Sequence, residues 1–327
     1  MLIVIEGLDG SGKSTQVKRL RNYLQTKSGN LEYIHFPRYD SPVYGELIGK
    51  FLRGGFGSID AVHPQLVALL YAEDRHGAAP QMWDTLNKGG IVLLDRYVYS
   101  NIAYQCAKIN DETRREELRE WIFDTEFGQF GLPRPDLNIF LDVPIGFVEK
   151  KLENPRGGDD RNYLEGRSDI HEADIEFQKN VRKVYLRQCE LDPGFIRVDC
   201  SDENGRMLPP DAISAAVQAV VEQIALYRKQ VSQTLRRHPR IRVLRSGSPE
   251  TDGPGRVNAD CQGIPELPSS RIPACNGRPD SRNVRIGRNH TRNLSSHGSL
   301  QESDRMGHHD TPRRLHPAYP VALDIEP

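Results

Sequence analysis

The chain is poor in cysteine, with five in 327 residues, and no two of them form a CxxC pair. A zinc site of the usual spacing and a disulfide framework are therefore not expected. Long apolar runs are also lacking, because the N-terminal run covers only residues 1–5 and no stretch reaches the roughly 18 residues of a membrane span. The sequence thus predicts neither a signal peptide nor a transmembrane helix, and a reducing cytoplasm is the expected location.

Lysine is absent from residues 231–327, whereas residues 1–230 contain 11. The C-terminal stretch holds 15 arginines against 10 acidic residues, 11 of the 22 prolines, and a single aromatic residue, Tyr319. Because such a composition cannot bury enough apolar surface to offset its chain entropy, disorder is predicted for residues 231–327 and one well-cored domain for residues 1–230.

Three explanations stay open for residues 231–327. The abrupt loss of lysine favours a frameshifted or read-through end without function. The alternatives are a basic extension that makes weak contacts with nucleic acid and a segment that folds on a partner.

Short apolar runs alternate with helical patterns through the first 230 residues. Five runs have the continuous apolar character of strands buried in a parallel sheet, at residues 2–5, 31–36, 91–95, 137–143 and 195–199. Helical patterns cover residues 13–26, 43–52, 64–86, 111–127, 169–191 and 210–230. In the third of these helices, an apolar stripe is predicted from Leu66, Leu69, Leu70 and Trp83.

This alternation predicts a three-layer α/β fold with a five-stranded parallel sheet and helices on both faces. Ligands of such sheets bind beyond the carboxyl ends of the strands. Polar residues directly after each predicted strand are therefore the candidates for ligand binding.

The stretch GLDGSGKST, residues 7–15, follows the first predicted strand and precedes a predicted helix. It fits the pattern G-x-x-x-x-G-K-[ST], in which glycines turn backbone N–H groups toward an anion and the helix adds its positive end. Lys13 should reach the β- and γ-phosphates, and the Ser14 hydroxyl should ligate Mg²⁺. A nucleoside triphosphate is thus expected on Gly7, Asp9, Gly10, Ser11, Gly12, Lys13, Ser14 and Thr15. The alternative is a glycine-rich turn that only starts a helix.

Charged side chains follow two other predicted strands. Asp95 ends the strand at residues 91–95 and is expected to hold Mg²⁺ directly or through water, unless it merely caps a helix. Arg96 follows it, and Arg38 lies just past the strand at residues 31–36. Two guanidinium groups at one edge of the sheet could clamp a second phosphate, the alternative being surface salt bridges.

Two helices carry side chains suited to a planar base. Tyr71 and Arg75 are four residues apart and share a face, so a ring could stack on a base while the guanidinium donates to it. A tyrosine covered by an arginine stem at the edge of the core is the alternative. Asn101, Tyr104 and Gln105 also share a face if residues 100–108 are helical, although a polar helix surface would show the same spacing.

Residues 154–168, NPRGGDDRNYLEGRS, combine three glycines with Arg156, Arg161 and Arg167. Glycine hinges that carry arginines are typical of a lid that closes over phosphates and adds positive charge to the transferred group. A plain solvated loop is the alternative reading of this composition.

Taken together, these segments resemble the thymidylate kinase family of P-loop nucleoside monophosphate kinases. The matching stretches occur in the family's order over residues 1–225 and read EGLDGSGKST, FPRYDSPVYGELI, LLYAEDR, DRYVYSNIAYQ and GLPRPDLNIFLDVP. The resemblance implies a P-loop NTPase fold and ATP-dependent, Mg²⁺-dependent phosphorylation of dTMP to dTDP. It also implies a homodimer, with no membrane partner and no nucleic acid beyond weak contacts of the basic tail.

The resemblance further implies a role for each site residue. Asp9 would bind the sugar 3′-hydroxyl, Arg38 and Arg96 the dTMP phosphate, Tyr71 the thymine ring, Arg75 its O4 atom, Asn101 and Gln105 the base, and Tyr104 the space at the 2′ position. Some members carry a catalytic arginine where this chain has Gly10, so Arg156 and Arg161 of the lid are expected to supply it. Asp169 and Glu172 would support the lid or the metal.

Two rival functions follow from the same residues. A deoxynucleoside kinase acting on thymidine would need a carboxylate base near the acceptor. A nucleotide-binding switch or scaffold with little transfer activity would not need the Arg38 and Arg96 clamp.

Overall fold

A five-stranded parallel sheet forms the centre of the fold. The computed structural model describes residues 1–153, 163–166, 169–172, 174–237, 241–243 and 323–325. The strands lie in the order β2 (Leu31–His35), β3 (Ile91–Asp95), β1 (Leu2–Gly7), β4 (Leu137–Asp142) and β5 (Phe195–Asp199). All five predicted strands are confirmed, and every residue of β1 and β4 is buried, as their continuous apolar character requires.

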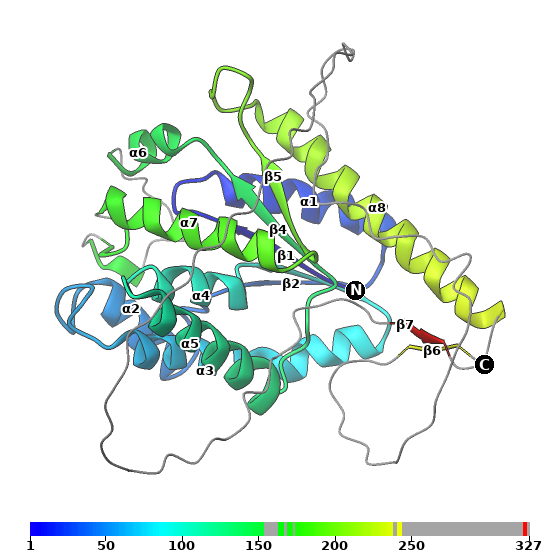
Figure 1. The fold of residues 1–327 in the computed structure, drawn as a ribbon, viewed down its shortest axis with the longest axis horizontal. Helices are drawn as coiled ribbons and strands as arrows, with labels where there is room; N and C mark the ends of the chain where they lie inside the picture. Colours follow the sequence, from blue (N-terminus) through cyan, green and yellow to red (C-terminus); the bar gives the residue numbers. More distant parts are fainter. Residues whose placement is uncertain (154–162, 167–168, 173, 238–240, 244–322, 326–327) are drawn as a thin grey trace, which may run out of the picture. The chain divides into compact units, whose positions relative to one another are not determined.

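Helices cover both faces of this sheet, which confirms the predicted three-layer arrangement (Figure 1). On one face, α1 (Lys13–Lys27) packs beside α8 (Pro210–Arg237). On the other, α4 (Val98–Cys106) lies between α3 (Pro64–Asn87) and α7 (Ile175–Leu191). The sheet is thus shielded from solvent except at its edges and strand ends.

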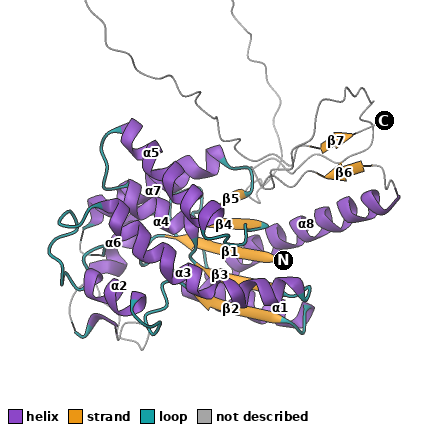
Figure 2. Ribbon diagram, turned by 90° about the horizontal axis from the view of Figure 1, so that it is seen from below, coloured by secondary structure: helices purple, strands orange, loops and turns teal. Residues whose placement is uncertain are grey.

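Further helical segments complete the fold (Figure 2). They are α2 (Tyr44–Leu52), α5 (Glu112–Phe123), the π-helical segment η1 (Asp124–Gln129) and α6 (Ile145–Glu153). Of these, α2 packs against α3, and α5 packs against α3 and α4. A separate antiparallel pair joins β6 (Ile241–Val243) to β7 (Leu323–Ile325). In the part of the chain that the structure describes, no helix combines the length and the apolar character needed to cross a bilayer.

Several sequence predictions need correction. The helix expected from residue 169 begins at Ile175, because Asp174 caps it by accepting hydrogen bonds from the N–H groups of residues 176 and 177. The helix expected over residues 111–127 ends at Phe123 and widens into η1. The helix α6 was not predicted.

The predicted apolar stripe of α3 is also wrong. Leu66 and Trp83 are 59% and 42% exposed, and Leu69 and Leu70 are only partly buried. The Trp83 indole N–H donates to the carbonyl oxygen of Gly131, which holds the ring at the surface. The buried face of α3 instead carries mostly small residues and two charged ones, and its members are Val67, Ala68, Ala72, Asp74, Arg75, Ala78, Ala79, Met82 and Thr85.

Two predicted segments lie largely or wholly outside the described residues. Of the lid at residues 154–168, only residues 163–166 are described. Of the segment at residues 231–327, the structure describes the end of α8, which continues past the predicted boundary to Arg237, together with β6 and β7. The predicted disorder of residues 231–327 therefore stays a prediction.

Substitution of a central core residue tests this arrangement. Leu94 lies on β3 with its side chain fully buried, so Leu94→Ala should lower the free energy of unfolding by about 2–5 kcal/mol in urea titrations. Leu226 on α8 is 61% exposed, and Leu226→Ala should change it by less than about 0.5 kcal/mol. Equal losses in the two variants would contradict the placement of Leu94 in the core.

Candidate functional site

Two glycines give the phosphate loop a left-handed backbone conformation. Gly10 and Gly12 have φ values of 71° and 78°, a left-handed conformation that residues with a side chain rarely adopt. A Cβ atom on Gly10 would also lie 3.2 Å from the Cβ atom of Lys151. Gly12 precedes α1, which places the exposed residues Ser14 and Thr15 in the first turn of that helix.

Asp95, at the end of β3, places a negative charge beside Lys13 of this loop. Its Oδ1 lies 3.8 Å from Nζ of Lys13, and its Oδ2 lies 3.2 Å from Nδ1 of His35. Burial alone would raise the pKa of Asp95, but Lys13 and His35 outweigh it and lower the pKa to about 2. The carboxylate is therefore ionised at neutral pH.

The oxygen donors at this edge suit a magnesium ion. Oδ1 of Asp95 is buried and accepts no hydrogen bond from the described residues. Mg²⁺ prefers oxygen ligands and usually takes one or two from the protein and the rest from phosphates and water. Ser14 and Asp95 fit that pattern, and no cluster of three or more His, Cys, Asp or Glu side chains within the described residues offers an all-protein site instead.

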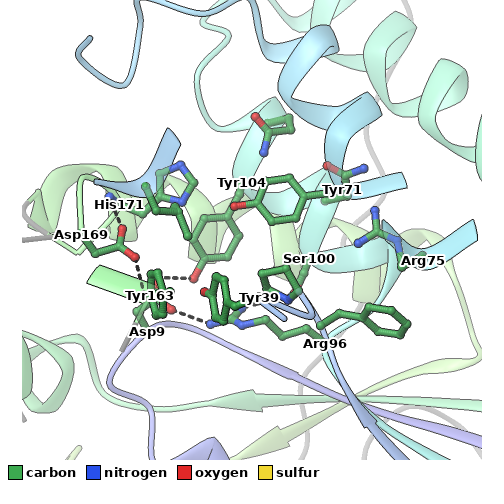
Figure 3. A pocket seen from close by; sticks show the side chains of 15 residues that line it. Asp9, Tyr39, Tyr71, Arg75, Arg96, Ser100, Tyr104, Tyr163, Asp169 and His171 are labelled. Carbon is green, nitrogen blue, oxygen red and sulfur yellow. Dashed lines mark hydrogen bonds and ion pairs between the residues drawn. The ribbon is translucent and has the colours of Figure 1, made fainter. Parts of the chain in front are cut away.

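A cavity opens beside the loop and gathers most of the side chains predicted for the second ligand (Figure 3). Seven of the eight line it: Asp9, Tyr71, Arg75, Arg96, Asn101, Tyr104 and Gln105. They come from the phosphate loop, α3, the end of β3, and α4. The topology thus brings together side chains that are up to 96 residues apart in the chain.

Arg96 connects this cavity to the phosphate loop. Its Nη2 lies 2.6 Å from Oδ1 of Asp9, and its Nη1 donates to the carbonyl oxygen of Gly7 and to Oγ of Ser100. Its guanidinium carbon also lies 5.2 Å from the centre of the Tyr104 ring. A cation held between the loop and the cavity can neutralise negative charge on either side.

The carboxylate of Asp9 accepts hydrogen bonds from three side chains in this part of the site. Besides Arg96, its carboxylate accepts hydrogen bonds from the hydroxyl of Tyr104 at 2.8 Å and from Nε2 of Gln178 at 3.0 Å. Burial would raise the pKa of Asp9, but Arg96 and Lys13 outweigh it and lower the pKa. Gln178 lies on α7 and was not recognised in the sequence.

Glu6, which the sequence reasoning also missed, fixes the backbone of Arg96. Arg96 has a φ of 68°, in the left-handed region. The fully buried Glu6 carboxylate accepts from the N–H groups of Tyr97 and Ser100 at 2.9 and 3.1 Å, and from the hydroxyls of Ser100 and Tyr185. Burial raises the pKa of Glu6, although these donors oppose the shift. Its signal in the sequence is a single carboxylate at the end of an apolar strand.

Arg75 and Asn101 share a third buried carboxylate, that of Glu126. Arg75 donates to it through Nε and Nη2 at 2.5 and 2.7 Å, and Nδ2 of Asn101 donates to it at 2.9 Å. Glu126 belongs to η1, and no sequence pattern marked it. Tyr71 lies one turn before Arg75 on α3 and presents its ring to the same cavity (Figure 3).

Arg38 is the predicted residue that the structure does not bring into this cavity. Its Nε lies 3.0 Å from Oδ1 of Asp74, and its Nη2 donates to the carbonyl oxygen of Asp74. The guanidinium lines a neighbouring cavity with Glu73 and His76. A Cβ atom on Gly77 would lie 2.9 Å from Nη2 of Arg38, so the small residue leaves room for this orientation.

The cavity wall also contains residues that were not predicted from the sequence to bind the second ligand. Tyr39 and Tyr163 stack with their ring centres 3.8 Å apart, and the Tyr163 hydroxyl donates to Asp169 at 2.8 Å. His171 lines the cavity next to Tyr104. Aromatic residues in loops carry no periodic signal.

Arg156 and Arg161, the arginines predicted to be catalytic, lie outside the described residues.

The chain is similar to several known proteins. A family model described as thymidylate kinase matches residues 5–207. The thymidylate kinase of Mycobacterium tuberculosis is 35% identical over 220 residues, which is 65% of this chain and all of that protein. The thymidylate kinase of Schizosaccharomyces pombe is 32% identical over 200 residues, covering 61% of this chain and 84% of the relative. A solved thymidylate kinase structure from Candida albicans has 31% identity and a TM-score of 0.50, covering 68% of this chain and 90% of its own.

A partly buried lysine beside Gln105 should give the stability of the protein a measurable pH dependence. Nζ of Lys108 donates to Oε1 of Gln105 at 2.8 Å and lies 4.9 Å from the Phe51 ring centre, and burial lowers the pKa of Lys108 to about 7. Between pH 7 and the ordinary value of 10.5, the unfolded chain binds one more proton than the folded chain. The free energy of unfolding should therefore rise with pH relative to Lys108→Met, by at most about 1.4 kcal/mol per pH unit.

Urea unfolding at pH 7.0, 8.0 and 9.0 measures this slope. Lys88→Met is the matched control, because the Lys88 side chain is 65% exposed, and it should follow the wild-type pH dependence. A Lys108→Met variant with the wild-type slope would contradict the burial of this amine.

Proposed function

The chain belongs to the thymidylate kinase family and phosphorylates dTMP with ATP as the donor, and we propose that the cavity lined by Asp9 and Arg96 binds dTMP. The observation that carries this proposal is that the phosphate loop and the cavity lined by Tyr71, Arg75 and Asn101 meet at one ion pair. That pair joins Nη2 of Arg96 to Oδ1 of Asp9 across 2.6 Å.

The donor is proposed to lie on residues 7–15. The backbone N–H groups of the loop and the N-terminus of α1 would hold the ATP phosphates, with Lys13 at the β- and γ-phosphates. The adenine would lie near residues 200–202, which follow β5 at the same edge of the sheet.

Ser14 and Asp95 are proposed to hold Mg²⁺ with the phosphates of ATP. When bound, the ion neutralises charge on the phosphates of the donor. The ionised state of Asp95, fixed by Lys13 and His35, supports this assignment.

The acceptor is proposed to occupy the cavity with its phosphate at Arg96 and its sugar 3′-hydroxyl at Asp9. Tyr71 would stack on the thymine, with Arg75 at O4 and with Asn101 and Gln105 near the base. Tyr104, whose hydroxyl is bound to Asp9, would fill the space at the 2′ position. Arg38 would join the phosphate only by leaving Asp74, so its role stays a prediction.

Positioning of the two substrates and neutralisation of their charge are proposed to supply most of the rate enhancement. An oxygen of the dTMP phosphate attacks the γ-phosphorus while the bond to the β-phosphate oxygen breaks, which yields dTDP and ADP. A phosphate dianion has no proton to remove, so the cavity needs no free carboxylate base. Asp9 is engaged by Arg96, Tyr104 and Gln178, an arrangement that suits a phosphate acceptor better than the hydroxyl of thymidine.

The finer features of the family are proposals for this chain. Arg156 and Arg161 are proposed to add positive charge to the transferred group, and Asp169 and Glu172 to support the lid or the metal. A homodimer is proposed with α3 in its interface, since Leu66 and Trp83 of that helix expose 59% and 42% of their surface. The proposed location is the cytoplasm.

Removal of either central cation tests the assignment. Lys13→Ala and Arg96→Ala should each lower kcat by about 10²-fold or more, because each removes a charge partner of one of the reacting phosphates, Lys13 on the donor and Arg96 on the acceptor. A coupled assay of ADP release, with dTMP and with thymidine as acceptor, measures this. Arg228→Ala on α8, where the arginine pairs with Asp136, should keep wild-type turnover. Full activity of Arg96→Ala, or faster turnover of thymidine than of dTMP, would refute the proposal.

The role of Glu6 is tested by comparing two substitutions. Glu6→Ala leaves the N–H groups of Tyr97 and Ser100 unpaired and frees Arg96 to shift, so kcat should fall by about 10²-fold. Glu6→Gln keeps an acceptor for both N–H groups and should retain most of the activity. Asp136→Ala controls for stability, because Asp136 accepts the N–H of Leu2 far from the cavity. A Glu6→Ala enzyme with wild-type kcat would show that Arg96 needs no such support.

A further inference from the structure

Glu126 lies behind the cavity wall and reaches both residues that face the base. Its carboxylate is fully buried and does not line the cavity, whereas Arg75 and Asn101 do. Oε2 accepts from Nε of Arg75 at 2.5 Å. Oε1 accepts from Nη2 of Arg75 at 2.7 Å and from Nδ2 of Asn101 at 2.9 Å. One carboxylate thus holds a guanidinium and an amide in fixed orientations.

The orientation of the Asn101 amide follows from its partners. Nδ2 donates to Oε1 of Glu126 and, at 3.0 Å, to the carbonyl oxygen of Ala68. The carbonyl can only accept, as can an ionised carboxylate, so the amide nitrogen must face these two atoms and the oxygen must face away. Oδ1 of Asn101 is buried and has no hydrogen-bond partner among the described residues. A buried acceptor of this kind is costly unless a ligand donates to it.

Arg75 supplies the complementary group. Two of its five N–H groups are bound to Glu126, and Nη1 makes no hydrogen bond to the described residues. Its side chain is only 2% exposed, and the charge of Glu126 compensates its own. The wall of the cavity therefore offers a fixed donor from Arg75 and a fixed acceptor from Asn101.

We infer that Glu126 is a specificity-determining positioning residue, which sets the hydrogen-bonding polarity of the base subsite so that it accepts thymine and rejects cytosine. This inference rests on the proposed binding of dTMP in this cavity. Thymine presents an acceptor at O4 and a donor at N3–H, which match Arg75 and Oδ1 of Asn101. Cytosine presents an amino donor at N4 and an acceptor at N3, so both contacts would be mismatched.

The variant Glu126→Gln tests the inference, because it keeps the shape of the side chain and replaces one acceptor oxygen with a donor amide. The Ala68 carbonyl still holds the Asn101 amide nitrogen, but in either orientation of the new side chain its amide nitrogen faces an N–H donor of Arg75. Arg75 therefore loses one acceptor, and its guanidinium shifts from the position in which it donates to the base. The ratio of kcat/KM for dTMP to that for dCMP should then fall by about 10- to 100-fold, as expected for one lost discriminating contact. The change should appear in the KM for dTMP, while kcat and the KM for ATP stay close to wild type.

Asp142→Asn is the matched control for the loss of a buried carboxylate. Asp142 is 2% exposed and accepts from Nε and Nη2 of Arg182 at 2.6 and 2.9 Å, but it does not line the cavity. Its variant should lose stability and keep the wild-type ratio of dTMP to dCMP. An equal change of the ratio in both variants would mean that Glu126 acts only through stability.

Three outcomes separate the possibilities. A folded Glu126→Gln enzyme with the wild-type ratio overturns the inference. If that variant does not fold, the wild-type enzyme is assayed with N3-methyl-dTMP, which cannot donate to Oδ1 of Asn101. Its kcat/KM should fall by about 100-fold or more relative to dTMP, and equal values overturn the inference. A wild-type enzyme that phosphorylates dCMP but not dTMP, or neither, refutes the proposed function itself.

Discussion

The hydrogen bonds to the buried carboxylate of Glu6 are the constraint on which the rest of the site depends. Arg96 follows β3 with a left-handed backbone, a conformation that costs a residue with a side chain about 1–3 kcal/mol. Glu6 offsets this cost from the neighbouring strand β1 by binding the N–H groups of Tyr97 and Ser100. Because Glu6 directly precedes the phosphate loop, that loop and Arg96 are anchored to the same side chain. This arrangement fixes the spacing of the two proposed ligand sites.

The site also balances its charges within the protein. Each arginine assigned to the acceptor is paired with a carboxylate in the structure, as Arg96 with Asp9, Arg75 with Glu126, and Arg38 with Asp74. A buried ion pair contributes little to stability, because desolvation offsets most of the attraction, but it restricts orientation strongly. The carboxylates thus decide which N–H groups remain available to a ligand. Under the proposed assignment, discrimination is divided between residues that touch the ligand and residues that hold them.

Much of the fold and part of the site could be predicted from the sequence. Apolar runs identified all five strands, since the central strands are buried on both faces and the edge strands β2 and β5 still carry apolar residues at their buried positions. The glycine pattern located the phosphate loop. Glu126 could not be found in this way, because its partners are 25 and 51 residues distant and η1 has no α-helical period. The stripe on α3 failed because Trp83 finds a partner at the surface, and the orientation of Arg38 depends on Asp74, which no local pattern reveals.

The segment η1 is a wide helical turn, and such turns arise when one residue is inserted into an α-helix. The insertion rotates every later side chain about the helix axis, and here it brings Glu126 inward. Loss of the residue at position 124 or 125 would leave every residue that lines the cavity unchanged and still turn the carboxylate away from it. Two homologous chains could therefore share all their contact residues and differ in the nucleobase they select, and an alignment gap outside the pocket would be the only trace of that difference.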